Sequence, residues 1–163
     1  MNITVMRIDD RLIHGQIVTR WIDYANAKMI MVVDDAAAGD KMQQMLLKFA
    51  IPSGIKLEIL SKTDALTRIQ NDDTNTNVLL MIRNPKEANS FVEMGFKIDQ
   101  INVGNISNSK SATGRKQMMD FIYLEENDVV ALKALGDKGI KLEIKALPTD
   151  RGRDAIEMIQ KNY

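Results

Sequence analysis

The sequence predicts an α/β fold for a single domain over residues 1–163, with three layers in the order α/β/α around a largely parallel, mixed central sheet. Short apolar runs alternate along the chain with longer amphipathic stretches, which is typical of repeated β-α units. Two of these runs are apolar almost throughout, as in central parallel strands that helices cover on both faces. A chain of 163 residues, 45% hydrophobic and 27% charged, suits one buried core and is short for two ordinary domains.

Strands are expected at the short apolar runs. In chain order these runs cover residues 3–8, 29–33, 78–82 and 101–103. A hexapeptide, Gly-Ile-Lys-Leu-Glu-Ile, occurs at 54–59 and again at 139–144. The similarity ends there, so we infer no duplication. Each copy alternates apolar and charged residues, which predicts two half-exposed strands at the edges of the sheet.

Two apolar stripes with helical spacing predict the first helices. The first stripe consists of Ile17, Val18, Trp21, Ile22 and Ala25. The second follows a candidate N-cap at Asp40 and consists of Met42, Met45, Leu46 and Phe49. We expect both stripes, Trp21 and most of the eleven methionines to lie in the core, because they fall on apolar faces.

Later helices are predicted by their capping residues. At 84–87 an asparagine cap precedes a proline at the first helical position and a glutamate that can close a capping box. A further helix is expected over 124–135 and is expected to end at Gly136. A short final helix is expected from about Asp150, and the segment 71–77 reads as a long polar loop.

Composition excludes several classes of protein. Lys+Arg and Asp+Glu both number 22, so the formal charge is zero and no overall field draws the chain to nucleic acid or to an anionic membrane. No nucleic-acid partner is expected. The absence of cysteine excludes disulfides and thiolate catalysis, and a single histidine leaves little for zinc, so no metal site is expected. No signal peptide is evident and no apolar run approaches the ~18 residues of a membrane span, so we expect a cytoplasmic protein.

Familiar nucleotide motifs are missing, so no cofactor is assigned. No two glycines are separated by a single residue, which excludes the Gly-x-Gly-x-x-Gly fingerprint. The nearest phosphate-loop candidate, 104–111, has Ser109 where a Walker loop requires glycine. Extended to Lys116, the same segment is polar and follows a predicted strand. It either reaches over a site built around His14 or is a solvated loop, and the sequence leaves both open.

The only histidine of the chain, His14, lies where the first predicted strand gives way to the first helix. A neutral imidazole carries a nucleophilic lone pair, and a helix N-terminus offers unpaired N–H groups and the positive end of a dipole. This combination is the chemistry of a phosphate acceptor. The alternative is a histidine with a purely structural role.

Residues beside His14 are suited to bind a phosphoryl group. Arg11 carries a planar, permanently charged fork that can contact two phosphate oxygens. The backbone N–H groups of Gly15, Gln16 and Ile17 can cradle the phosphate if the helix begins there, and glycine allows close approach. No magnesium is needed in such a scheme.

Neighbouring carboxylates have two interpretations. Asp10 or Asp9 can orient Arg11 or the imidazole, or can cap the turn before the helix. Asp34 and Asp35 follow the second predicted strand, where they either border the site or cap a helix. The sequence does not separate these roles.

Four motifs are considered together: Ile-Asp-Asp-Arg-Leu-Ile-His-Gly-Gln at 8–16, Val-Val-Asp-Asp at 32–35, Asn-Val-Gly at 102–104 and Leu-Pro at 147–148. Together they resemble the IIB component of the mannose/sorbose family of the bacterial phosphoenolpyruvate-dependent sugar phosphotransferase system. The resemblance covers about 1–150 and departs from the family at Asn105, where a second glycine is common.

The resemblance implies a phosphocarrier. The histidine of the motif, here His14, would take a phosphoryl group from the phosphohistidine of a IIA protein or domain. It would pass the group to a sugar entering through the IIC and IID membrane proteins, as a protein-N(π)-phosphohistidine–sugar phosphotransferase modified on Nδ1. The chain would then work at the inner face of the membrane. Mannose, fructose, sorbose, glucosamine and N-acetylgalactosamine all remain open as the sugar, because the family selects it chiefly in the membrane components.

Two other classes compete with this interpretation. One is a non-catalytic α/β module that binds phosphate or sugar phosphate near His14 and is never covalently phosphorylated. The other is a small α/β hydrolase, which would require a second titrating group or a metal cluster, and no such paired spacing is evident. Covalent phosphorylation separates the carrier from both.

Overall fold

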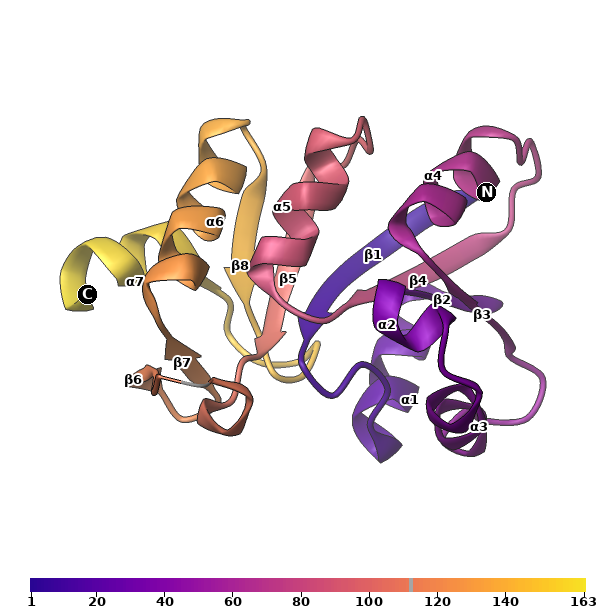
Figure 1. Ribbon diagram of the computed structural model, residues 1–163, viewed down its shortest axis with the longest axis horizontal. Helices are drawn as coiled ribbons and strands as arrows, with labels where there is room; N and C mark the ends of the chain where they lie inside the picture. The colour runs from indigo at the N-terminus through magenta and orange to yellow at the C-terminus, as the bar shows by residue number, and fades with distance from the viewer. Residues whose placement is uncertain (112) are drawn as a thin grey trace.

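A central sheet with helices on both faces forms the fold, as the sequence predicts (Figure 1). The computed structural model describes residues 1–111 and 113–163. The strands are β1 Asn2–Asp9, β2 Met29–Val33, β3 Lys56–Leu60, β4 Asn77–Ile82, β5 Gln100–Asn105, β6 Lys116–Met119, β7 Ile122–Leu124, β8 Lys141–Ile144 and β9 Arg153–Asp154. Seven of them form one sheet in the order β3-β2-β4-β1-β5-β8-β9, in which β9 alone is antiparallel to its neighbour. The sheet is therefore mixed but largely parallel.

The helices form the two outer layers. They are α1 Gly15–Ala25, α2 Asp35–Ala38, α3 Lys41–Phe49, α4 Lys62–Gln70, α5 Pro85–Glu93, α6 Glu126–Asp137 and α7 Ala155–Asn162, with a short 3₁₀ turn η1 at Asn108–Lys110. Buried residues of α4, α5, α6 and α7 pack together on one face of the sheet, and those of α1, α2 and α3 pack on the other. This separation gives the three predicted layers.

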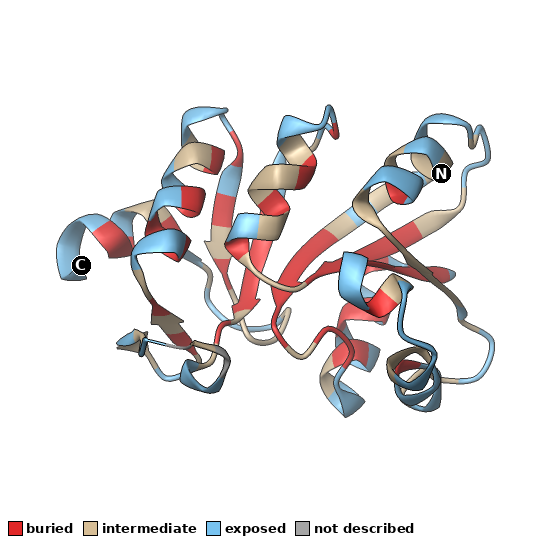
Figure 2. Cartoon of the chain, viewed as in Figure 1, coloured by how far each residue is buried: buried red, intermediate tan, exposed pale blue. Residues whose placement is uncertain are grey.

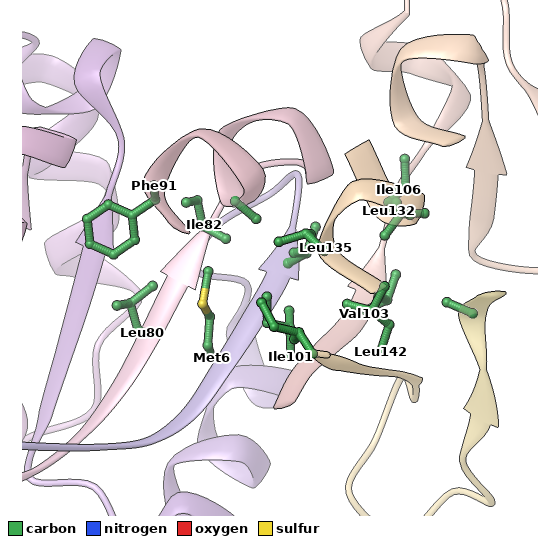
Figure 3. Packing of buried hydrophobic residues seen from close by; sticks show 14 of the residues in the cluster. Met6, Leu80, Ile82, Phe91, Ile101, Val103, Ile106, Leu132, Leu135 and Leu142 are labelled. Carbon is green, nitrogen blue, oxygen red and sulfur yellow. The ribbon is translucent and has the colours of Figure 1, made fainter. Parts of the chain in front are cut away.

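The larger core cluster lies between the sheet and α4–α7 (Figures 2 and 3). Met6 and Ile8 of β1 meet Leu80 and Ile82 of β4 in this layer. Phe91 of α5 is fully buried and stacks on Phe96 with 4.6 Å between ring centroids. Burial of this kind contributes about 1.5–3 kcal/mol per large apolar side chain, so this layer stabilises the central strands.

The opposite face of β1, β5 and β8 is polar. Alternate residues of a strand point to opposite faces, and here Arg7, Asn102 and Glu143 alternate with the core residues of their strands. The chain after β8 crosses this face: Trp21 Nε1 donates to the Ala146 carbonyl at 2.9 Å, and Arg7 donates to the Lys145 carbonyl at 2.9 Å. Buried polar groups therefore lie directly beneath the predicted site.

Helix α3 forms where predicted but faces the other way. Asp40 caps it by accepting hydrogen bonds from the backbone of Met42 and Gln43 at 3.0 and 3.1 Å. Its stripe of Met42, Met45, Leu46 and Phe49 is exposed, however, and Phe49 is 81% exposed. Most of α3 is accordingly coloured as exposed in Figure 2. The helix packs through Leu47, and Gln44 donates to two carbonyls of α2. The prediction that this stripe and its methionines lie in the core was wrong.

Boundaries after Asn105 also differ from the prediction. Leu124 ends β7 of an unpredicted β6–β7 hairpin, so α6 begins only at Glu126. Gly136 does not end α6, which continues to Asp137; the left-handed residue beyond it is Gly139, with φ 82°. The final helix begins at Ala155 rather than near Asp150, because Asp150 closes a turn by accepting from Leu147 N while Asp154 caps α7.

Two further differences concern the sheet and one helix. Strand β3 is at an edge as predicted, but β8 is not the last strand because the two residues of β9 pair with it. Helix α4 was not predicted; Ser61 caps it, accepting from Asp64 N at 3.1 Å. In the described part of the chain, no helix is both long and apolar enough to cross a membrane.

Candidate phosphoryl-transfer site

His14 is solvent-exposed in the loop that joins the carboxyl end of β1 to α1. It is the N-cap residue of α1, with extended backbone angles, φ −141° and ψ 101°. Its neighbours across the sheet are the ends of β4 and β5, since Ile8 pairs with both Ile82 and Val103. Ligands of open parallel sheets bind at this edge, so the imidazole is placed where the sequence predicts it.

The loop is tight and carries two left-handed residues. Leu12 N donates to the Asp9 carbonyl at 2.9 Å, and Leu12 itself has φ 61°. Such an angle costs a non-glycine residue about 1–2 kcal/mol, and the burial of Leu12 and Ile13 in the core offsets it. Gly15 has φ 43°, so glycine is favoured there by its backbone conformation.

The first turn of α1 is open to an anion. Gly15 and Gln16 are exposed and Ile17 is half-buried. The helix has no acidic residue in its first turn, and among the described residues no side chain caps its N–H groups. The first N–H groups of any helix lack intrahelical partners, so the three predicted phosphate-binding residues present donors beside His14.

Arg11 is held in place by Asp9. Its Nε and Nη2 donate to the two carboxylate oxygens at 3.0 Å each, and its backbone N donates to Oδ1 at 3.0 Å. These hydrogen bonds raise the pKa of Arg11. Among the described residues no group accepts from Nη1, so this end of a side chain that is 30% exposed has N–H groups to offer a ligand.

Asp10 is hydrogen-bonded to the loop after β5 rather than to Arg11. It makes no hydrogen bond to Arg11; its carboxylate accepts from Asn105 Nδ2 at 2.7 Å, Ser107 N at 2.8 Å and Ser107 Oγ at 2.6 Å. By hydrogen bond, Asp9 is the residue that orients Arg11. Asp10 instead fastens the loop after β5 to the histidine loop, and Asn105 supplies one of the bonds.

Most of the segment 104–116 is anchored, although Ala112 lies outside the described residues. Arg115 Nη1 donates to the Ser107 carbonyl at 2.6 Å, and Arg115 Nε pairs with Asp128 of α6 at 2.9 Å. Burial raises the pKa of Asp128. The described part of the segment is thus tied to the histidine loop through Asp10 and to α6 through Asp128, and none of its described hydrogen bonds reaches His14.

Asp34 combines the two roles that the sequence left open. Its carboxylate caps α2 by accepting from Ala37 N at 2.9 Å and accepts from Arg83 Nε and Nη2 at 3.0 Å each. Arg83 also lies 3.5 Å from the Asp10 carbonyl, so the pair borders the histidine loop. Asp35 is the first residue of α2 and accepts from Lys62 N at 2.8 Å.

Sequence reasoning assigned no role to Arg7 or to Asn102 of the Asn-Val-Gly motif, and both lie beneath the loop. Both are buried, and Arg7 donates to Asn102 at 2.6 Å and to Asp9 Oδ2 at 3.2 Å. The sequence did contain a signal for Arg7, because a charged residue within an apolar strand requires buried partners. The partners themselves are up to 138 residues away, beyond any local pattern.

Comparison with known proteins gives a consistent result. The sequence model of the PTS system sorbose subfamily IIB component matches residues 3–163. The chain is 35% identical over 161 residues to the PTS system fructose-specific EIIB component of Bacillus subtilis, covering 98% of this chain and 97% of that protein. It is 34% identical to the mannose-specific EIIAB component of Escherichia coli K12, covering 99% of this chain but 49% of that longer protein.

Solved structures show the same relationship. The IIBSor domain of the sorbose permease from Klebsiella pneumoniae is similar with a TM-score of 0.92 at 30% identity, over 100% of this chain and 99% of that one. The N-acetylgalactosamine-specific IIB component 1 from Escherichia coli is similar with a TM-score of 0.87 at 28% identity, over 94% and 99%. With the family match spanning nearly every residue, the chain belongs to the sorbose subfamily of IIB components of the sugar phosphotransferase system.

Proposed function

We propose that His14 is the residue that carries the phosphoryl group in this IIB component. The observation that carries the proposal is the exposed imidazole at the start of α1, three residues after an arginine that a buried aspartate holds by three hydrogen bonds. Phosphoryl transfer needs a positioned nucleophile and neutralisation of charge on the transferred oxygens, and little else from the protein.

Two balanced transfers make up the reaction. In the first, the phosphorus–nitrogen bond of a donor phosphohistidine breaks as a phosphorus–nitrogen bond forms to Nδ1 of His14; the imidazole of His14 gives up one proton and the released donor imidazole gains one. In the second, the bond to Nδ1 breaks as a hydroxyl oxygen of the sugar bonds to phosphorus, and the hydroxyl proton passes to the released imidazole of His14. No free phosphate is produced, because the phosphoryl group passes directly from each donor to the next acceptor.

Each predicted phosphate-binding group has a part in these transfers. The free end of Arg11 and the N–H groups of Gly15, Gln16 and Ile17 bind the transferred oxygens in the transition state. Asp9 keeps the Arg11 fork in position before the donor arrives. Binding groups set in advance require little reorganisation during transfer, which is the main way a protein accelerates this chemistry.

The partners follow from the family. We assign the donor as a phosphorylated IIA protein or domain, supported by the Escherichia coli mannose relative, whose name joins A and B components and of which this chain spans 49%. The acceptor is a sugar of the mannose, fructose, sorbose or N-acetylgalactosamine class, delivered through IIC and IID membrane proteins. We place the chain in the cytoplasm, associated with the inner face of the membrane through these proteins.

Intact-mass spectrometry tests the proposal. After incubation with phosphoenolpyruvate, the general phosphotransfer proteins and a matching IIA, the chain should gain one phosphoryl group of ~80 Da. The adduct should be lost in mild acid and survive alkali, because protonation makes the imidazole of a phosphoramidate a good leaving group. A serine phosphate would show acid stability instead.

His14→Gln removes the nucleophile while keeping a polar side chain of similar size. It should fold normally, accept no phosphate and fail to support sugar phosphorylation by membranes that contain IIC and IID. Lys48→Gln, which changes an exposed residue of α3, should behave as the unaltered protein. An acid-labile adduct on His14→Gln would show that His14 is not the carrier.

A further inference from the structure

The Asp9 carboxylate is shared between two arginines. Arg7 Nη2 donates to Oδ2 at 3.2 Å from within the sheet, and Arg11 donates to both oxygens at 3.0 Å from the loop. Asp9 is 2% exposed and Arg7 is 1% exposed, so neither exchanges these bonds for water. Arg11, at 30% exposure, is the member of the trio that reaches solvent.

The charges of this trio do not cancel. Two guanidinium groups and one carboxylate give the trio itself a net charge of +1. The neighbouring Asp10 carboxylate, whose hydrogen-bond donors are the neutral Asn105 and Ser107, adds a negative charge that acts on Arg11, so the second guanidinium is needed all the more. If Asp9 met Arg11 alone, the pair would be neutral, and the aspartate that orients the arginine would also cancel its attraction for a phosphoryl group. A phosphoryl group carries a charge of about −1.5 to −2 near pH 7, so a net positive charge close to it in a partly buried site attracts it.

Arg7 is fixed in place by many partners. Its guanidinium donates to Asn102 Oδ1 at 2.6 Å and to the Lys145 carbonyl at 2.9 Å, and it lies over the Trp21 ring, 4.8 Å from the centroid. Burial lowers the pKa of Arg7 to about 10, so it stays charged at neutral pH. A buried charge with this many partners is costly to assemble, and a neutral side chain would fill the same space.

We propose that Arg7 is a positioning residue for phosphoryl transfer: it balances Asp9, so that Asp9 can aim Arg11 at the phosphoryl group without cancelling its positive charge. This inference rests on the proposed role of His14. Arg7 itself, at 1% exposure, does not touch the phosphoryl group. Its influence passes through Asp9 to Arg11 and, as a charge, to the phosphorylated imidazole.

A charge-removal cycle tests the inference. Arg7→Met fills a similar volume without charge, and it should slow phosphorylation of His14 by about tenfold to a hundredfold. The double variant Arg7→Met with Asp9→Asn should recover much of that loss, because the introduced amide still accepts from Arg11 but carries no charge to cancel it. Asp9→Asn alone weakens the hydrogen bonds that position Arg11, and it is the second single variant that the double-mutant cycle requires. Arg151→Met, on the exposed turn before β9, is the matched control and should be unchanged.

A second readout separates charge from packing. The pKa of the phosphoryl group on phosphorylated His14, followed by ³¹P NMR, should rise in Arg7→Met, because a smaller positive field favours the protonated phosphoryl group. It should return toward the original value in the double variant. A role confined to packing would leave this pKa unmoved and would give no recovery.

The outcomes are distinguishable from failure of the proposed function. If the unaltered chain accepts no phosphoryl group, the carrier role and this inference both fail. If it is phosphorylated and a folded Arg7→Met matches it in rate and in phosphoryl pKa, the inference alone is overturned. Should Arg7→Met not fold, Arg7→Lys keeps the charge and should retain most of the transfer rate; loss of folding in both variants would assign Arg7 a structural role only.

Discussion

Gly104 of β5 lies against the guanidinium group of Arg7. A Cβ atom at this position would lie within 3.0 Å of Cζ and of both terminal nitrogens, a separation that real Cβ atoms essentially never show. The need for glycine here is spatial rather than conformational. The Asn-Val-Gly motif at 102–104 therefore has a physical explanation, since Asn102 binds Arg7 and Gly104 leaves room for it.

Replacing Gly104 with alanine should disturb Arg7. Hydrogen bonds hold Arg7 in place, so either its guanidinium group or β5 must shift to make room for the added methyl group. We expect the free energy of unfolding to fall by about 1–3 kcal/mol. Phosphorylation of His14 should also slow. Gly39→Ala is the control, because its added Cβ would meet only the Ala36 carbonyl at 3.9 Å. Urea unfolding and timed intact-mass spectra measure both effects; equal stability of the two variants would contradict the spatial argument.

Arg11→Lys tests the need for a forked side chain. Lysine keeps the charge but cannot donate to both Asp9 oxygens and still offer planar N–H groups to the phosphoryl group. We expect an unchanged fold by circular dichroism and phosphorylation slower by tenfold to a thousandfold, roughly 1.4–4 kcal/mol of transition-state stabilisation. Unchanged transfer kinetics in the folded variant would remove Arg11 from the site.

Gly15 tests the conformation of the histidine loop. Its φ of 43° strains any L-residue, while nothing lies within 4 Å of an added Cβ, so the cost is conformational alone. Gly15→Ala should lose about 1 kcal/mol of unfolding free energy. Gly15→Asn should lose less, because asparagine tolerates left-handed angles better. Thermal denaturation ranks the three proteins, and an alanine variant as stable as the asparagine variant would refute this explanation.

Local patterns predicted the elements well but not their surroundings. Strand β2 coincides with the predicted 29–33, because a strand buried on both faces leaves a continuous apolar run. The α3 stripe shows the limit: spacing tells which residues share a face, but which face meets the sheet depends on packing far along the chain. The same holds at the site. The motif located His14 and Arg11, but the hydrogen bonds of Arg7 to Asn102 and of Arg83 to Asp34 join residues far apart in the sequence, which no local pattern predicts.

The reversed α3 face predicts different costs for two adjacent leucines. Leu46 is 62% exposed and Leu47 is 6% exposed. Leu47→Ala removes a packed side chain and should lower the free energy of unfolding by about 2–4 kcal/mol. Leu46→Ala should change it by no more than about 0.5 kcal/mol. Chemical denaturation of both variants measures the difference, and similar losses would mean that the stripe is buried after all.

Stability at low pH should depend on the Asp34–Arg83 pair. Burial on its own raises the pKa of Asp34, but the hydrogen bonds from Arg83 and from Ala37 N outweigh it, and the resulting pKa lies below the ordinary value of 3.8. A carboxyl group whose pKa is lower in the folded state stabilises the fold above the unfolded-state pKa, and this contribution is lost as the pH falls through the folded-state pKa. The loss is therefore expected at pH values below 3.8.

Asp34→Asn isolates this contribution, because asparagine can still accept from Ala37 N but forms no ion pair with Arg83. At pH 5–7 the variant should be less stable than the unaltered protein by about 1–3 kcal/mol, the range for removing a charged hydrogen-bonding partner. The difference should shrink as the pH falls below 3.8, since protonated Asp34 loses the same interaction. Urea unfolding at a series of pH values measures the difference, with Asp23→Asn on the exposed side of α1 as the control. If the difference in free energy of unfolding between the two proteins stays constant at acidic pH, the charge of Asp34 does not contribute to the stability of the fold.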